Sequence, residues 1–145
     1  SIWNTDLVDN TDYIYDNTQG TLYTPTWTTS GTAPAIGNGT LSGRYWRIGR
    51  IVWFRMNFTA GSTTTFGTGR FEFTLPLTAG ETLAACSAIF HDVGTAIISG
   101  SAYLINTSEF TPVSTNEVTN AVPFTWSAAN GDSMQVAGFY LATGN

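Results

Sequence analysis

Alternating apolar and polar residues predict β-strands along most of the chain. The clearest case is residues 51–58, where Val52, Phe54, Met56 and Phe58 form one apolar face and the intervening residues form a mixed face. A period of two with one apolar face is the pattern of a strand that covers a core. We therefore expect the even-numbered side chains of this segment to point inward.

Turn signals separate further strands of the same kind. Gly49-Arg50 joins two of them, and Asn130-Gly131 is a strong hairpin signal before the last one. The expected strands span residues 22–27, 44–48, 51–58, 71–75, 84–90, 96–105, 110–114, 124–127 and 134–142. Pro25 marks the first of them as an edge strand. Short strands at regular spacing predict an all-β, antiparallel two-sheet sandwich of the jelly-roll type.

Residues 1–20 differ from the rest of the chain. Asp6, Asp9, Asp12 and Asp16 recur there at near-helical spacing, but the intervening Asn and Thr residues are weak helix formers. A short helix is one interpretation, and we favour an extended or irregular lead-in that joins the domain to protein upstream of Ser1. The carboxylates do not follow the spacing of a calcium-binding loop. Residues 21–145 are expected to form a single domain.

The composition of the chain argues against several classes of ligand. The chain has 145 residues, 42% of them hydrophobic and 10% charged, with no lysine and a net charge of −5. An acidic, lysine-free domain is poorly suited to bind DNA, RNA or an anionic membrane. Cys86 is the only cysteine, so an intrachain disulfide is impossible, and its apolar neighbours predict a buried thiol. No apolar run is long enough to span a membrane, so membrane insertion is not expected. Four of the five arginines, Arg44, Arg47, Arg50 and Arg55, are close in sequence, and we interpret them as strand-edge or interface charge.

Residues for catalysis are scarce. His91 is the only histidine, and its neighbour Asp92 would point to the opposite face of a strand, unlike the partner in a catalytic triad. A Cys86–His91 dyad would need an exposed thiolate. The few carboxylates show no paired spacing, and one Cys with one His cannot complete a zinc site. We expect neither an enzyme nor a cofactor.

One run of residues resembles the terminal domains of bacteriophage tail fibre and minor tail proteins. It comprises Tyr23-Thr-Pro-Thr-Trp27, Gly37-Asn38-Gly39, Gly43-Arg-Tyr45, Gly49-Arg-Ile-Val52 and Phe73-Thr-Leu75-Pro76. The resemblance covers residues 21–77 and, more loosely, the Gly131-Asp132 turn with the strand after it. These motifs mark turns and the strands beside them, and they carry no information on a ligand. Residues 83–120 match no pattern that we recognise.

The resemblance implies a homotrimeric jelly-roll tip on an exposed part of the virion, assembled in the host cytoplasm. Its partners would be the upstream fibre shaft and a glycan or protein of the host cell surface. The mixed face of residues 51–58 suits a subunit interface. The candidate interface residues are Ile51, Trp53, Arg55 and Tyr140. The candidate receptor-contact residues, expected in loops, are Phe66, His91, Asp92, Trp126 and Asn130.

Three alternatives stay open. The first is a purely structural trimerisation or capsid-decoration domain, which predicts the same trimer without a ligand. The second is a carbohydrate-binding module, which predicts a monomer with exposed aromatics such as Trp27, Trp46, Trp53 or Trp126. The third is a polysaccharide hydrolase, the least favoured because the acids are few and unpaired in sequence.

Overall fold

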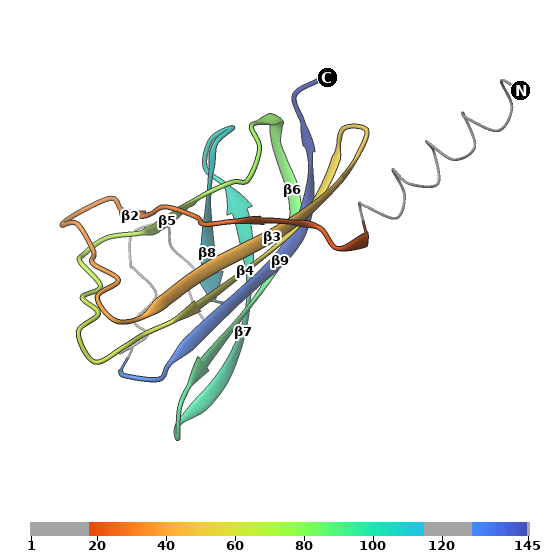
Figure 1. Ribbon diagram of the computed structural model, residues 1–145. Coiled ribbons are helices and arrows are strands. Elements are labelled where there is room, and N and C mark those ends of the chain that lie inside the picture. Colours follow the sequence, from red (N-terminus) through yellow and green to blue (C-terminus); the bar gives the residue numbers. More distant parts are fainter. Residues whose placement is uncertain (1–17, 115–128, 145) are drawn as a thin grey trace, which may run out of the picture.

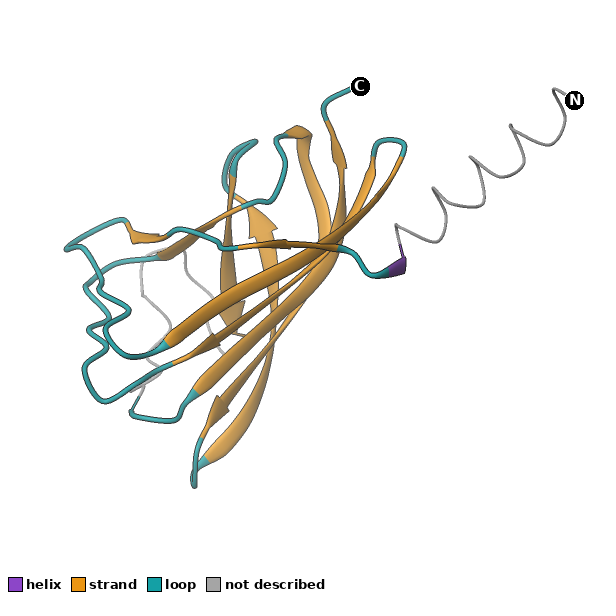
Figure 2. Ribbon diagram, viewed as in Figure 1, coloured by secondary structure: helices purple, strands orange, loops and turns teal. Residues whose placement is uncertain are grey.

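Residues 18–114 and 129–144 are described by the computed structural model, and almost all of their regular structure is β-strand (Figure 2). The predicted lead-in up to residue 17, the predicted strand at 124–127 and Trp126 lie outside these residues. The described strands are β1 (Thr21–Tyr23), β2 (Trp27–Thr29), β3 (Thr40–Ile48), β4 (Ile51–Thr59), β5 (Phe71–Thr74), β6 (Ala79–Asp92), β7 (Ala96–Leu104), β8 (Glu109–Ser114) and β9 (Ser133–Ala142).

The strands form one sheet in the order β1-β3-β4-β9-β6-β7-β8-β5-β2, and every neighbouring pair is antiparallel. The all-β, antiparallel prediction is therefore confirmed. Strands far apart in sequence lie side by side at the centre, where β9 pairs with both β4 and β6 (Figure 1). These three strands are also among the longest, so the middle of the sheet offers a broad, continuous outer face.

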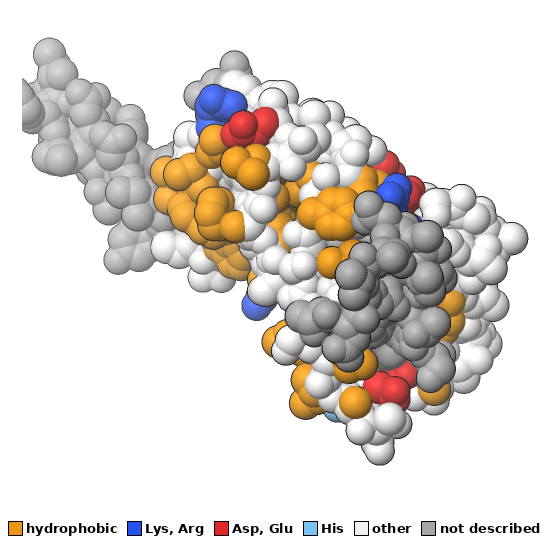
Figure 3. Space-filling view, turned by 180° about the vertical axis from the view of Figure 1, so that it is seen from behind, with side chains coloured by type: hydrophobic (Ala, Val, Ile, Leu, Met, Phe, Trp, Pro, Cys, Tyr) orange, Lys and Arg blue, Asp and Glu red, His pale blue; other side chains and the backbone are white. Residues whose placement is uncertain are grey.

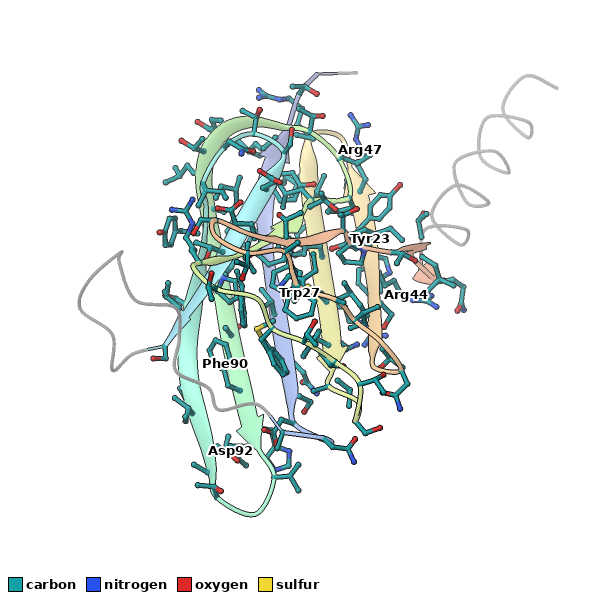
Figure 4. The ribbon with its side chains drawn as sticks, turned by 90° about the vertical axis from the view of Figure 1, so that its left-hand side faces the viewer. Tyr23, Trp27, Arg44, Arg47, Phe90 and Asp92 are labelled. Carbon is teal, nitrogen blue, oxygen red and sulfur yellow. The ribbon has the colours of Figure 1, made fainter. Side chains whose placement is uncertain are left out.

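The sheet is strongly curled. Its two edge strands, β1 and β2, are separated by residues 24–26 alone. Four steps of extended chain reach at most about 14 Å, so the two edges must approach each other closely. Residues 24–27, which we call the strap, cross the open side of the curled sheet (Figure 4).

The core lies inside this curl. Along β4, Val52, Phe54, Met56 and Phe58 are all buried, which confirms the inward face predicted from the alternation. Phe54 of β4 packs on Phe110 of β8 with ring centroids 5.2 Å apart. Across the same core, Trp27 of the strap packs edge-on against Phe58 at 5.0 Å. These contacts hold the two ends of the sheet together face to face.

The segment at residues 22–27, predicted as one strand, is instead split between β1 and β2. Pro25 lies between them, where its missing N–H removes a ladder hydrogen bond and the chain passes from one sheet edge to the other. The turn predictions are confirmed: Gly49 and Gly131 have φ angles of 58° and 94°, a region that favours glycine. The strand predicted at 84–90 extends further, with a register shift between Ala79 and Ala84.

Candidate functional site: an exposed apolar patch on the outer face

An exposed apolar patch lies on the outer face of the sheet, over β4, β9 and β6. Trp53 of β4 is the register partner of Phe139 of β9, which is in turn the partner of Ala85 of β6. Trp53 and Phe139 keep 42% and 46% of their surface exposed, and Leu83 keeps 74%. Together with their neighbours they line a shallow groove of about 470 Å³. We call its outward apolar members the outer patch: Ile51, Trp53, Leu83, Ala85, Phe139 and Leu141.

The outer patch is continuous rather than a set of scattered side chains. Ile51 and Leu141 are register partners one pair beyond Trp53 and Phe139, so two adjacent cross-strand pairs are apolar. Figure 3 shows hydrophobic side chains gathered in a patch at this end of the domain, with charged groups at its border. Large contiguous apolar patches are uncommon on monomeric soluble proteins and mark interaction surfaces.

Strand periodicity explains why these residues point outward. In β9 the even-numbered Met134, Val136 and Tyr140 are buried, so the odd-numbered Phe139 and Leu141 face the other side. Tyr140 is thus wrongly predicted as an interface residue, since it is only 1% exposed. Its hydroxyl donates to Leu77 O at 2.7 Å and accepts from Leu77 N at 3.1 Å, which explains how this polar group is tolerated in the core.

Arg55 borders the outer patch on the outer face of β4. Its guanidinium carbon lies 5.8 Å from the ring centroid of Trp46, within the range of a cation–π contact. Trp46 is the register partner of Trp53, so the aromatic row continues from β9 through β4 to β3. The predicted interface residues Ile51, Trp53 and Arg55 therefore share one exposed face, and Arg55 adds a charge that is oriented by an aromatic ring.

The chain enters the domain beside the outer patch. Trp46 Nε1 donates to Thr18 O at 3.2 Å, and the Arg44 guanidinium donates to the carbonyl oxygens of Gln19 and Gly20. Gly20 has a φ of 66°, and a Cβ there would lie 2.5 Å from the Trp46 ring. Residues 18–20 are thereby fixed against β3, on the same face as the outer patch.

The other clustered arginines bind main-chain carbonyls of their own chain. Arg47 Nε donates to Gly49 O at 2.7 Å, and Arg50 Nε donates to Ala142 O at 3.0 Å. Arg50 thus ties the β3–β4 turn to the end of β9, the strand that carries Phe139. Within the described residues the one salt bridge joins Arg70 to Glu72 at 2.7 Å, away from this cluster.

A second group of exposed apolar side chains lies at the opposite end of the sheet. Ile89 of β6, Val93 of the following turn and Ile97 of β7 keep 48%, 53% and 72% of their surface exposed. His91 is exposed beside them and is the register partner of Ile97. We call this group the distal hairpin. His91, predicted in a loop, and Asp92 are in fact the last residues of strand β6, and the hairpin projects beyond the body of the domain (Figure 1).

Two other predicted contact residues have different outcomes. Phe66 is only partly exposed, because its ring packs against Trp27, Phe58 and Phe71 with centroids 5.8–6.3 Å apart. The expectation that Phe66 is an exposed loop aromatic is therefore wrong, because its ring packs at the edge of the hydrophobic core. Asn130 is exposed in the turn before β9, so it is accessible as predicted.

The loop at residues 61–69 is bonded to the loop at residues 30–39. Ala35 and Thr65 exchange two backbone hydrogen bonds of 2.8 Å. The Asn38 side chain accepts from the backbone N–H and the hydroxyl of Thr63, both at 3.0 Å, and donates to Ser62 Oγ at 3.1 Å. The threonine, serine and asparagine side chains that crowd this segment therefore link the two loops to each other.

Asp132 joins three loops at the distal end. Its side chain is buried, and its carboxylate accepts from Val93 N at 2.8 Å and from Ala129 N at 2.6 Å. Its own carbonyl oxygen accepts from Ala60 N at 2.8 Å, at the end of β4. One acidic side chain thus fixes the distal hairpin against the turn that precedes β9.

The reactive side chains do not come together. Cys86 and His91 lie on opposite faces of β6, since Cys86 packs against the core and His91 faces outward. Burial raises the pKa of the Cys86 thiol to about 11, so the thiolate needed for nucleophilic chemistry is scarce at neutral pH. Among the described residues, no three His, Cys, Asp or Glu side chains lie close enough to hold a metal ion.

The candidate interface residues named from the sequence did not include Phe139, Leu141 and Leu83, although the apolar run at residues 139–141 indicated a strand with two apolar faces. A signal for the first two was present: the alternation that starts at Met134 assigns even numbers to the core and odd numbers to the surface. Leu83 follows the register shift within β6, which strand periodicity does not reveal.

Within the described ranges, no helix has the length and apolar character needed to cross a bilayer. Comparisons of this chain with protein-family models, with curated proteins and with solved structures found no match.

Proposed function

We propose that this chain is the homotrimeric tip domain of a bacteriophage tail fibre, which attaches the virion to a glycan or protein of the bacterial surface. The observation that carries the proposal is the outer patch, a continuous apolar surface on the outer face of β4, β9 and β6. Aromatic and aliphatic side chains free of charge at their centre are typical of the core of a subunit interface. We infer that copies of the same chain cover this surface, as the homotrimer implied by the sequence resemblance requires.

The position of the patch supports this assignment. Residues 18–20 are bonded to Arg44 and Trp46 beside it, so the preceding chain approaches the domain there. A trimer formed through the outer patch would bring three such entry points together, as continuation from a fibre shaft requires. The curled sheet, which packs β4 against β8, is also compatible with the jelly-roll-like sandwich that the resemblance implies.

In this proposal the distal hairpin contacts the host. Its exposed Ile89, Val93 and Ile97 lie at the end of the sheet away from the outer patch and the entering chain. The buried Asp132 carboxylate holds the turn at Val93 in place, so the surface is preorganised and loses little conformational entropy on binding. The domain acts by binding and assembly, without a catalytic step.

A second candidate is a structural domain without a host ligand. It is favoured by the hydroxyl-rich loops at residues 30–39 and 61–69, whose polar groups are largely bonded to each other. Loops built in this way stabilise a virion surface and offer fewer free groups to a receptor.

Attachment of the fluorescently labelled protein to a panel of bacterial strains tests the proposal and separates the two candidates. The attachment function predicts binding to at least one strain. Ile97→Ser should weaken that binding and leave the oligomeric state intact. Phe139→Ser should weaken it by loss of avidity, on the order of 100-fold. Thr28→Val, on the outer edge of β2, is the matched control. Binding that is equal for all variants would refute the assigned surfaces.

A further inference from the structure

A second groove lies between the strap and the loop that leads into β3. Its volume is about 580 Å³, within the range of small-molecule sites, roughly 300–1,000 Å³. Trp27 points from the strap toward the interior, beneath the chain that crosses the open side of the sheet (Figure 4). The lining residues are Thr24, Pro25, Trp27, Pro34, Ile36, Gly39, Thr40 and Leu41. We call this the strap groove.

Hydrogen bonds hold both walls of the strap groove in place. On the strap side, Thr26 N donates to Thr74 Oγ1 at 2.8 Å, and Thr74 N donates to Thr26 O at 3.1 Å. On the loop side, the Ile36 carbonyl accepts from Gly39 N at 2.9 Å and from Thr64 Oγ1 at 2.6 Å. The groove is therefore formed before a ligand arrives, which lowers the ordering cost of binding.

The chemistry of the lining is apolar at the centre and hydroxylated at the rim. Trp27 and Leu41 are partly buried, whereas Thr24 and Thr40 are exposed, with no side-chain hydrogen bond to the rest of the described chain. The Trp27 indole N–H is buried and also has no acceptor within the described residues.

We propose that the strap groove binds a neutral carbohydrate, one or two sugar residues of a surface glycan; this inference rests on the proposed attachment function and adds a glycan site to the contact made by the distal hairpin. A pyranose has an apolar C–H face for the tryptophan and leucine and hydroxyl groups for Thr24 and Thr40. No charged residue lines the groove, and the chain carries a net charge of −5, which disfavours anionic sugars. A proline-rich peptide also fits aromatic grooves, and it is the alternative occupant that the test separates from the sugar.

The test is a ¹H–¹⁵N NMR titration of the full chain with the methyl glycosides of glucose, galactose, mannose and N-acetylglucosamine, and separately with a proline-rich peptide. We expect at least one glycoside to shift the Trp27 indole signal and the amide signals of Thr24, Gly39 and Thr40. Thr40→Val should weaken that binding about tenfold, the effect of losing one hydrogen bond. Thr28→Val, exposed on β2 outside the groove, should leave it unchanged.

Three results would overturn the inference: no shift with any glycoside, shifts confined to residues outside the groove, or groove shifts with the peptide alone. The oligomeric state and bacterial attachment of Thr40→Val are measured in parallel. A trimer that attaches to bacteria but binds no glycoside contradicts the strap groove and leaves the proposed function standing. A monomer that binds glycosides in the groove but attaches to no strain contradicts the fibre-tip function and leaves the groove standing.

Discussion

Replacing Asp132 with alanine should loosen the distal end of the domain. The buried carboxylate accepts hydrogen bonds from Val93 N at 2.8 Å and Ala129 N at 2.6 Å. Alanine removes both acceptors at once and leaves two amide donors beside a small cavity. The turn before β9 would then keep its backbone bonds to Ala60, and the distal hairpin would keep the strand pairing of His91 with Ser133.

The expected loss of stability follows from those two hydrogen bonds. A hydrogen bond to a charged group contributes about 1.5–3 kcal/mol, so two such bonds set an upper range of about 3–6 kcal/mol. Val93 and Ala129 are both exposed, and water can solvate the freed amides, which reduces the loss. We expect the free energy of unfolding to fall by about 2–4 kcal/mol. Urea unfolding followed by tryptophan fluorescence measures it, at one fixed protein concentration because assembly also contributes to stability.

Two further variants control this prediction. Asp132→Asn keeps one acceptor oxygen and should lose about half as much stability as alanine. Asp92→Asn changes a carboxylate at the end of β6 that makes no comparable pair of amide contacts, and it should stay within about 0.5 kcal/mol of the unmodified protein. A loss below about 1 kcal/mol for Asp132→Ala would refute the reasoning, since the carboxylate would then not organise the loops.

Three other perturbations have defined outcomes. Burial raises the pKa of Tyr140 from its usual value near 10 to about 12, because the folded protein favours the neutral phenol. The stability that the neutral Tyr140 side chain provides below pH 10 should therefore be lost as the pH rises toward 12. Tyr140→Phe should flatten this part of the pH profile in urea titrations, lower stability at pH 7 by about 1–3 kcal/mol and leave the oligomeric mass unchanged. Cys86 should react slowly with iodoacetamide at pH 8, and the rate, followed by mass spectrometry, should rise until the pH passes about 11; fast reaction at pH 8 would show an exposed thiol. Gly138→Ala places a Cβ 2.5 Å from Ala85 O, so β9 and β6 must separate locally. The free energy of unfolding, measured by thermal denaturation, should therefore fall by about 1–3 kcal/mol.

The strands and the inward face of β4 were predictable because periodicity acts locally. Val52, Phe54, Met56 and Phe58 alternate without interruption, and the turn at Gly49 needs a positive φ that glycine provides. The same alternation does not distinguish one curled sheet from two stacked sheets, because both have one buried and one exposed face. The split of residues 22–27 between two edges is also beyond local pattern, since it depends on where β3 and β5 lie.

The candidate sites were predictable only in part. Ile51, Trp53 and Arg55 share a strand face, so their grouping followed from sequence, whereas Tyr140 was placed on the wrong face although the alternation from Met134 places it inside. Phe66 lies in a Gly- and Thr-rich loop, which indicates exposure by composition. Its burial comes from tertiary contacts with Trp27 and Phe71, and no local signal encodes them.

The most direct test of the central claim is the mass of this chain in solution, measured by light scattering after size-exclusion chromatography over a dilution series. We expect a mass of three chains for the unmodified protein and for Ile97→Ser. For Trp53→Ser combined with Phe139→Ser we expect a mass of one chain, with β-sheet content unchanged by circular dichroism. A mass of one chain for the unmodified protein at every concentration, or a trimer that survives the loss of both aromatic side chains, would contradict the assignment of the outer patch as the subunit interface.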